Sequence, residues 1–257
     1  MTKDLVSIIM PSYNCGEYVE ETIRSVQAQT YQNWEIIFTD DCSTDDTVRR
    51  ISELREKDSR IKLFQNKFNS GAAVSRNNAL RETKGKWIAF LDSDDLWEPE
   101  KLEKQVRFMK ENGYFFSYTC YQEIDSEGTL TGVKVSGPKH VTKSGMYAFC
   151  WPGCLTVMYD REKIGLIQIE DIKKNNDYAM WLKVCQKADC YLLNECLAKY
   201  RRGRAGSVSS HGIMTMIGWH YKLFRDAEKM GVLLSLWHTG VNLICGFYMK
   251  QKYVKKV

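Results

Sequence analysis

Three carboxylates fall within four residues at Asp92-Ser93-Asp94-Asp95, directly after the apolar residues 86–91. Like charges this close repel one another unless a positive group lies between them. A hard divalent cation such as Mg²⁺ or Mn²⁺ prefers oxygen ligands, and a ligand with its own oxygens, such as a diphosphate, would complete the coordination. The alternative is an acidic turn that caps the next helix, because Asp is a common turn residue. The motif therefore predicts either a metal site or a capping turn.

Two other polar clusters follow apolar runs earlier in the chain. The sequence Ser-Tyr-Asn at residues 12–14 follows the run at 5–10, and Asp40-Asp41 follows the run at 34–38. Each run has the length and β-branched composition of a buried strand. The two aspartates could also serve only to end a strand and cap the next helix. In an open parallel sheet, however, ligands bind outside the carboxyl ends of the strands, so three clusters at such ends predict one shared ligand site.

The elements that must position these clusters alternate regularly along the first part of the chain. Strands are predicted at residues 5–10, 34–38, 61–64 and 86–91, and helices at 18–29, 72–81 and 100–110. A further helix is predicted from the capping-box pattern at residues 43–46 through residue 54. Alternation of this kind predicts an α/β fold, with a mainly parallel central sheet covered by helices on both faces.

The pattern changes beyond residue 114. Two strands at 115–124 and 130–135 flank a Ser-Glu-Gly turn, which predicts a smaller antiparallel element. Further short strands are predicted at 155–159, 192–193 and 197–200, with a helix at 178–187 between them.

Taken in order, these motifs resemble the family 2 inverting glycosyltransferases with the GT-A fold. The matching segments are Pro11-Ser12-Tyr13-Asn14, residues 25–31, Asp40 to Asp45, residues 69–77, Phe90 to Asp95, Asn176 to Trp181, and Leu197 to Arg201. No single motif is specific to the family, but the ordered set extends over residues 5–210. The resemblance implies the transfer of a sugar from a nucleotide diphosphate sugar to an acceptor hydroxyl, in the synthesis of a cell-surface polysaccharide.

The resemblance also implies roles for individual residues. Asp94 would be the main ligand of a divalent metal, Mn²⁺ or Mg²⁺, and Asp92 would assist at the metal or the ribose. Asp177 would be the general base, placed on a chain segment different from the one that holds the leaving group. The remaining nucleotide-sugar contacts would come from Pro11, Tyr13, Asn14, Asp41, Arg76 and Ser93, with Asp41 on the nucleobase. Contacts to the diphosphate or the acceptor would come from Trp151, Trp181, Arg201 and Arg202.

Each of these residues also has a structural interpretation. Asp177 could cap the helix that follows it, and Glu170 and Asp171 are rival candidates for the base. Arg76 could form a surface ion pair, and the basic segment at 201–202 could be a solvated loop. Aromatic residues pack more often than they recognise ligands, so Tyr13 and both tryptophans could be core residues.

The chain departs from the family pattern at two positions. Cys42 stands where the family often has Gly, which could alter the turn after Asp41. Asn176 stands before the proposed base where an acidic residue is common, so this base would have no charged neighbour.

The organisation follows from the motifs. Residues 1–210 are expected to form the catalytic domain, with a nucleotide-sugar half at 1–112 and an acceptor half at 113–210, followed by a helical tail at 211–257. Residues 232–248 are apolar except for a narrow polar stripe at helical spacing, and lysines follow them. Seventeen residues span about 25 Å as a helix, less than a hydrocarbon core of ~30 Å, so a helix in the membrane interface is favoured over a span. The alternatives are packing on the catalytic domain or on a second chain as a homodimer.

Charge and cysteine content limit the partners and the compartment. The chain carries a formal +5, but residues 199–257 hold eleven Lys and Arg against two acidic residues. An acidic front with a basic tail argues against a nucleic-acid-binding face and fits a tail that meets anionic lipid. Nine cysteines without a C-x-x-C pair indicate free thiols, and residues 5–10 are too short for a signal peptide. We therefore expect a cytoplasmic protein at the inner face of the cell membrane.

The function expected from the sequence is an inverting, metal-dependent sugar transferase that uses a nucleotide sugar, most plausibly a UDP-sugar, and a glycan or lipid-linked acceptor. The alternative is a catalytically silent sugar-nucleotide-binding or scaffolding protein on the same fold. A Rossmann dehydrogenase or a P-loop enzyme is excluded because neither glycine motif occurs in the chain.

Overall fold

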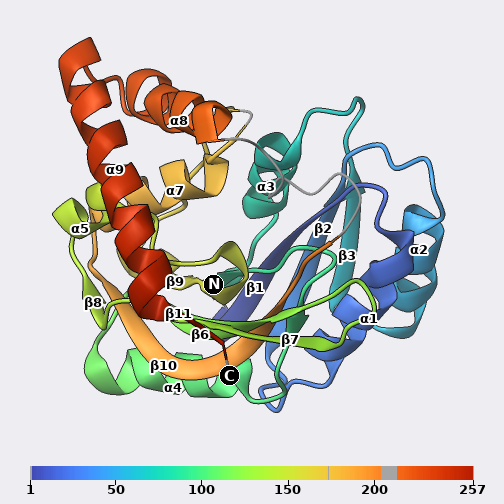
Figure 1. Ribbon diagram of the computed structural model, residues 1–257. Helices are drawn as coiled ribbons and strands as arrows, with labels where there is room; N and C mark the ends of the chain where they lie inside the picture. The colour runs from blue at the N-terminus through green and yellow to red at the C-terminus, as the bar shows by residue number, and fades with distance from the viewer. Residues whose placement is uncertain (1, 173, 204–212, 257) are drawn as a thin grey trace.

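The computed structural model describes residues 2–172, 174–203 and 213–256 (Figure 1). The first half contains β1 (Thr2–Ser12), α1 (Gly16–Gln27), β2 (Trp34–Asp40), α2 (Thr47–Lys57), β3 (Ile61–Gln65), α3 (Ala72–Arg81), β4 (Gly85–Phe90), β5 (Leu96–Trp97) and α4 (Lys101–Asn112). The second half contains β6 (Phe116–Ile124), β7 (Leu130–Val135), β8 (His140–Val141), α5 (Lys143–Ala148), η1 (Cys154–Thr156), β9 (Met158–Asp160), α6 (Arg161–Ile164), α7 (Asn176–Cys185) and β10 (Cys190–Arg201). The tail contains α8 (Ile213–Lys222), the π-helical segment η3 (Leu223–Ala227), α9 (Val232–Tyr253) and β11 (Val254–Lys256).

The strands form one sheet whose first half is parallel. Strands β4, β1, β2 and β3 lie side by side in that order and all run the same way. Beyond β4 the sheet becomes mixed, because β9 is antiparallel to both β4 and β6, while β10 is parallel to β6. Strands β6 and β7 pair antiparallel, as their sequence predicted. The expected mainly parallel sheet with an antiparallel element in the second half is confirmed.

Helices cover both faces of this sheet, and the alternation of side chains along each strand explains why. In β1, Ile8 packs in a core with α1, α2 and α4, whereas its neighbour Ile9 packs in a second core with α3 and α7. In β2, Ile36 and Ile37 divide between the two cores in the same way. Successive side chains of a strand point to opposite faces, so a run of consecutive apolar residues requires cover on both sides.

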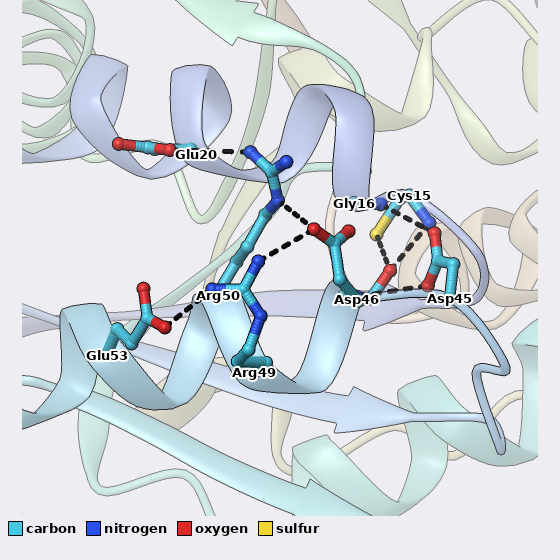
Figure 2. Close-up of polar contacts among 9 residues, drawn as sticks. Cys15, Gly16, Glu20, Asp45, Asp46, Arg49, Arg50 and Glu53 are labelled. Carbon is cyan, nitrogen blue, oxygen red and sulfur yellow. Dashed lines mark hydrogen bonds and ion pairs between the residues drawn. The ribbon is translucent and has the colours of Figure 1, made fainter.

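The loop after β2 holds the starts of α1 and α2 together (Figure 2). The carboxylate of Asp45 accepts hydrogen bonds from the backbone N–H groups of Gly16 (3.0 Å) and Thr47 (3.0 Å). Asp46, the residue before α2, instead pairs with Arg49 and Arg50 on the first turns of that helix. The predicted capping box is therefore wrong in detail, because no side chain of residues 43–46 caps α2 in that pattern and Asp45 serves two helices.

Two other elements differ from the prediction. The two short strands expected near the end of the catalytic region are one strand, β10, whose pairing with β6 shifts register on either side of Cys196. The tail helix α9 is longer than expected, since it continues to Tyr253 instead of ending at residue 248. The expected boundary between the catalytic domain and the tail, at residues 210–211, lies outside the described residues.

Candidate functional site

The first two polar clusters meet at the carboxyl ends of β1 and β2. Ser12 lies opposite Asp40 in the parallel register of these strands, and its hydroxyl donates to the Asp40 carboxylate at 3.2 Å. Asn14 adopts a left-handed backbone conformation (φ 46°) and accepts a hydrogen bond from Thr44 N–H at 2.8 Å. The loops that follow the two strands are thus fixed to each other, at the sheet edge where the sequence placed them.

Asp41 organises the loop between β3 and α3. Its Oδ1 atom accepts hydrogen bonds from the Asn66 side chain and the Ser70 N–H, both at 2.8 Å, and its Oδ2 atom accepts one from the Gly71 N–H at 2.7 Å. Gly71 has φ +86°, a conformation that side-chain-bearing residues rarely adopt. Three of about four acceptor positions on this carboxylate are therefore used within the chain. The role predicted for Asp41 at a nucleobase is left with one acceptor position.

The third cluster, after β4, is joined to α3 by a close ion pair. The Arg76 guanidinium is buried, and its Nη2 atom lies 2.5 Å from Oδ1 of Asp92, whose side chain remains partly exposed. The surface pair considered from the sequence is thus wrong in its setting, because this arginine lies inside the site. A buried ion pair fixes the relative orientation of its two side chains more firmly than a pair in water does.

Arg76 also reaches the far side of the site. Its Nη1 atom donates to Oδ1 of Asn176 at 2.9 Å, across 100 residues of sequence. Asn176 begins α7, and Asp177 follows it in the first turn. Burial opposes the charge of Arg76, but Asp92 and Asp177 together hold its pKa above the ordinary value. One guanidinium therefore connects the carboxylate run after β4 to the helix that carries the proposed base.

The start of α7 is positioned by packing one turn later in the helix. Trp181 is fully buried, with its ring 5.1 Å from that of Phe90 in an edge-to-face arrangement. The contact with an acceptor that was expected of Trp181 is therefore not supported, because the indole lies in the core between α7 and the sheet. Asp177, four residues earlier, is half-buried, and its Oδ1 atom accepts the Tyr178 N–H at 2.8 Å. It does not cap α7, because the residue before the helix is Asn175.

The rival bases lie in different settings. Glu170 forms an ion pair with Lys183 at 2.5 Å, and Asp171 is exposed to solvent. Only Asp177 among the three acts on the pKa of Arg76 as a principal charge. Glu170 is thus engaged with Lys183 and Asp171 lies on the surface, whereas Asp177 adjoins the Asn176 contact of Arg76.

Arg201 does not face a ligand. Its side chain is 1% exposed, and its donors are used within the chain: Nε on the Asp94 carbonyl (2.8 Å), Nη1 on the carbonyls of Asp125 (3.2 Å) and Ser126 (2.8 Å), and Nη2 on Glu21 (2.6 Å). The expected contact of Arg201 with a diphosphate is therefore corrected: this residue holds the carboxylate loop by its backbone. The next residue, Arg202, is half exposed and pairs with Glu123 at 2.9 Å, so it stays a candidate contact.

Asp95 carries the electrostatic cost of the acidic run. It is buried, and one oxygen accepts the Arg201 N–H at 2.8 Å, while its Oδ2 atom has no hydrogen-bond partner among the described residues. Burial, and then the neighbouring charges of Asp94 and Asp92, raise the pKa of Asp95 well above its ordinary value. A raised pKa favours the protonated, uncharged form, so Asp95 adds little to the negative charge of the loop.

The acidic run after β4 raises the question of whether it holds a metal ion. Among the described residues, no group of three or more His, Cys, Asp or Glu side chains is arranged to hold a metal by itself. A Mg²⁺-type cation that is bound together with a diphosphate needs only one or two protein carboxylates, however. Asp92 and Asp94 would supply such oxygens, and next to them Oδ2 of Asp95 has no hydrogen-bond donor among the described residues. The residues fit a divalent cation that arrives with its ligand.

The remaining predicted residues lie in varied surroundings. Pro11 and Ser93 are buried, so any contact of theirs with a nucleotide would have to come from backbone atoms. Tyr13 is 47% exposed beside them and is not a core residue. Trp151 is half-buried, donates from its indole to the Gly145 carbonyl at 3.0 Å, and packs against Tyr253 of the tail.

Sequence reasoning missed two thiols. Cys154 is close enough to the site for the charges of Arg76, Asp92 and Asp177 to act on its pKa, which burial raises well above the ordinary value. Cys150 lies within reach of the charge of Asp177 in the same way. The raised pKa of each favours the neutral thiol, so neither adds a charge near the ion pairs. Their sequence spacing carried no signal, because the loop that holds them reaches the site only through tertiary packing.

Comparisons with known proteins bear on the family of the chain. The model of glycosyl transferase family 2 matches residues 7–155. TuaG of Bacillus subtilis, provisionally assigned as a teichuronic acid biosynthesis glycosyltransferase, is 40% identical over 236 residues, which cover 91% of this chain and 93% of the relative. The UDP-Glc:alpha-D-GlcNAc-diphosphoundecaprenol beta-1,3-glucosyltransferase WfaP of Escherichia coli is 41% identical over 214 residues, 83% of each chain.

Solved structures show the same fold at lower sequence identity. Residues 1–349 of Staphylococcus aureus TarS, in complex with UDP-GlcNAc, superpose with a TM-score of 0.72 at 21% identity, over 96% of this chain and 76% of that one. The Pyrobaculum calidifontis mannosyltransferase PcManGT, in complex with GDP-Man and Mn²⁺, superposes with a TM-score of 0.64 at 17% identity, over 95% of this chain and 75% of that one.

Proposed function

The chain belongs to glycosyl transferase family 2 and has the GT-A fold, and we propose that it transfers a hexose from a UDP-sugar to a sugar hydroxyl with inversion of the anomeric carbon. The observation that carries this proposal is the reach of Arg76, from Asp92 after β4 to Asn176 beside Asp177. An inverting displacement needs a leaving group on one side of the sugar and a base on the other. We infer that Asp177 and the carboxylate run lie across this site from each other, because one nitrogen of Arg76 bonds Asp92 and another bonds the residue next to Asp177.

Asp177 is the proposed base. It comes from the acceptor half of the chain, residues 113–210, whereas the carboxylate run comes from the nucleotide-sugar half, residues 1–112. Asn176, at the position where the family often has an acid, keeps a hydrogen bond to Arg76 without adding a charge. Asp177 is therefore the only carboxylate in the first turn of α7, and it is available to accept the proton from the acceptor hydroxyl.

Asp92 and Asp94 are proposed to hold a divalent cation together with the diphosphate of the donor. When bound, such a cation neutralises the charge that develops on the leaving diphosphate. Asp95 and Arg201 support the loop from behind, the former through its bond to the Arg201 N–H and the latter through the Asp94 carbonyl. Mn²⁺ and Mg²⁺ both suit oxygen ligands of this kind.

The nucleotide is proposed to lie at the ends of β1 and β2. The exposed ring of Tyr13 offers a face for the base, the backbone at Pro11 and Ser93 offers hydrogen-bonding edges, and Asp41 has one acceptor position left. Asn14 fixes the loop that carries Tyr13 by its bond to Thr44. Arg202 and Trp151 remain proposed contacts for the diphosphate or the acceptor.

The relatives suggest both substrates. WfaP and a second E. coli relative at 41% identity, WfgD, are named for transfer from UDP-Glc to alpha-D-GlcNAc-diphosphoundecaprenol. We propose UDP-glucose as the donor and a sugar on a lipid diphosphate as the acceptor, in the assembly of a cell-surface polysaccharide. Such an acceptor places the enzyme at the inner face of the cell membrane.

The proposal is tested with the purified chain, UDP-glucose and a GlcNAc-diphospholipid acceptor, with and without Mn²⁺. Calorimetry measures donor binding, and release of UDP measures turnover. Asp94→Asn is expected to lose both the metal-dependent part of donor binding and turnover, because it removes a charged oxygen ligand. Asp177→Asn is expected to keep donor binding and lose turnover.

Glu195→Gln is the matched control, because Glu195 is an exposed carboxylate that pairs with Lys104 on the surface. It is expected to behave as the wild type. Donor binding without turnover for any UDP-sugar or acceptor would support the alternative, a silent sugar-nucleotide-binding protein. Turnover retained by Asp177→Asn would show that another residue is the base.

A further inference from the structure

The tail helix α9 is amphipathic in the reverse sense. Its polar residues Ser235, Thr239 and Asn242 are buried against the rest of the protein, whereas most of its large apolar side chains face solvent. The most exposed are Leu233 (84%), Ile244 (73%), Trp237 and Phe247 (67% each), with Val232, Leu234, Leu236 and Tyr248 about half exposed. A helix on the surface of a soluble protein shows the opposite arrangement.

The inward polar face is a well-formed contact. The Asn242 side chain donates to the Tyr178 hydroxyl of α7 at 2.9 Å. Gly246 lies so close to the Phe149 ring that an added Cβ would stand 3.0 Å from it. These contacts fix the rotation of α9 about its axis, so the apolar face is held outward.

We propose that the outward face of α9 docks on an anionic phospholipid membrane, with the helix lying flat in the interface. From Val232 to Met249 the helix carries no Asp, Glu, Lys or Arg. In Figure 1 it lies along one side of the molecule, beside α5 and α8. An apolar face of this size marks a site that another phase or partner covers.

The charges around the apolar face identify the partner. Lys222, Arg225 and Lys229 precede α9, and Lys250, Lys252, Lys255 and Lys256 lie at or just after its end, against only two acidic residues in 213–256. The apolar face is thus bounded at both ends by cations, which complement anionic headgroups and contribute about 1 kcal/mol each near such a surface. A second copy of the chain on this face would instead bring two cationic surfaces together, which disfavours a dimer here.

The ends of the helix distinguish a flat arrangement from a span. Among the described residues, α9 is the one helix long and apolar enough to cross a membrane, and at ~1.5 Å per residue its length is about 33 Å. The apolar stretch expected at residues 232–248 is thus part of a longer helix, which could cross a membrane by length and composition alone. The inward contacts to Tyr178 and Phe149 would have to break in a span, however, and so would the pairing of β11 with β7 directly after the helix.

The docked helix would act directly on the site. Tyr178, which accepts the bond from Asn242, is the residue after Asp177. If the proposed function holds, as this one step requires, the membrane surface would lie beside Asp177 and next to an acceptor anchored in the same membrane. The docking itself does not depend on that function.

The test uses the full chain and vesicles without donor or acceptor, so that its outcome is independent of catalysis. Sedimentation is measured with vesicles of phosphatidylcholine alone and with phosphatidylglycerol added. The wild type is expected to bind the anionic vesicles, and binding is expected to weaken as salt is raised. The triple variant Trp237→Gln, Ile244→Gln, Phe247→Gln is expected to lower vesicle binding by roughly ten-fold or more, because it removes the inserted apolar groups.

Charge is tested in parallel. Replacement of Lys250, Lys252, Lys255 and Lys256 by Gln is expected to lower binding to anionic vesicles by roughly ten-fold or more and to leave the weak binding to neutral vesicles unchanged. The matched controls are Leu130→Gln, an exposed apolar residue on β7, and the pair Arg55→Gln, Lys57→Gln on α2. Both controls are expected to bind as the wild type does.

Three outcomes would overturn the proposal. One is a wild type that does not bind anionic vesicles. Another is a wild-type dimer that the apolar triple variant converts to a monomer, which would show that a second copy covers the face. The third is retention on the vesicles through an alkaline wash, since a flat helix is released by such a wash and a spanning helix is not.

Discussion

The buried side chain of Arg201 is the strongest structural support of the carboxylate loop, and its removal gives a quantitative test. In Arg201→Met, the backbone N–H that bonds Asp95 is kept, but the carbonyls of Asp94 and Ser126 lose this donor, and that of Asp125 keeps only the Gly128 N–H. Each buried acceptor left without a partner costs about 1 kcal/mol or more. Glu21 is 54% exposed and can turn to water, so it adds little. The sum is a loss of roughly 3–5 kcal/mol in the free energy of unfolding.

The assay is denaturant and thermal unfolding of the variant beside two controls. For a chain of this size, about 3–5 kcal/mol corresponds to a fall in Tm of roughly 10 °C. Arg202→Met removes a half-exposed arginine of the same length and is expected to cost less than about 1 kcal/mol. Glu21→Gln, which keeps the three carbonyl contacts of Arg201, is expected to cost about as little.

The same variants separate support of the loop from contact with the donor. If Arg201 holds the loop, Arg201→Met loses stability, and Asp94 is misplaced as a consequence. If Arg201 instead grips the diphosphate, the variant would bind UDP-glucose more weakly at unchanged stability. An unchanged Tm in Arg201→Met would therefore refute the structural reasoning.

Two further changes test local features away from the proposed chemistry. Lys101 is fully buried, its Nζ atom has no hydrogen-bond acceptor among the described residues, and burial lowers its pKa well below the ordinary value. The unfolded chain then binds a proton that the folded chain does not, so wild-type stability rises with pH up to about pH 10. Lys101→Met is expected to be more stable by about 1–3 kcal/mol near neutral pH, with an advantage that narrows toward pH 10 in urea titrations; an advantage independent of pH would contradict this. Cys42 has φ +64°, a left-handed backbone conformation. Cys42→Val is therefore expected to lower the free energy of unfolding by about 1–2 kcal/mol, and Cys42→Gly to keep it or raise it by up to about 1 kcal/mol. Equal melting temperatures of the two variants would show that the backbone there is unstrained.

The first half of the fold could be predicted because local patterns determine it. The strands and helices up to α4 follow from runs of apolar residues and from helical spacing, and α3 and β7 occupy the predicted residues. The meeting of the clusters at residues 12–14, 40–41 and 92–95 on one edge follows from a general property of parallel sheets. Cys42 illustrates the same point at one residue, because the comparison with Gly already indicated an unusual turn and the backbone there is left-handed.

The errors concern the directions in which side chains point. Periodicity shows that α9 has a polar and an apolar face, but the same spacing results whether the polar face is outside or inside. Arginine is rarely buried, so nothing local indicated that Arg201 lies under the carboxylate loop. Trp181 was equally open to either interpretation until its packing against Phe90 was known. The bond from Arg76 to Asn176 joins segments 100 residues apart, and no pattern in one sequence reveals such a pair.

The configuration of the new glycosidic bond tests whether Asp177 is the base of an inverting displacement. If Asp177 activates the acceptor from the side opposite the leaving diphosphate, transfer from UDP-α-glucose must invert the anomeric carbon. Proton NMR of the product of the wild-type chain, recorded without delay after transfer, reads this configuration. We predict a β-linked glucose. An α-linked product would contradict it, because retention requires a different arrangement from one base facing one leaving group.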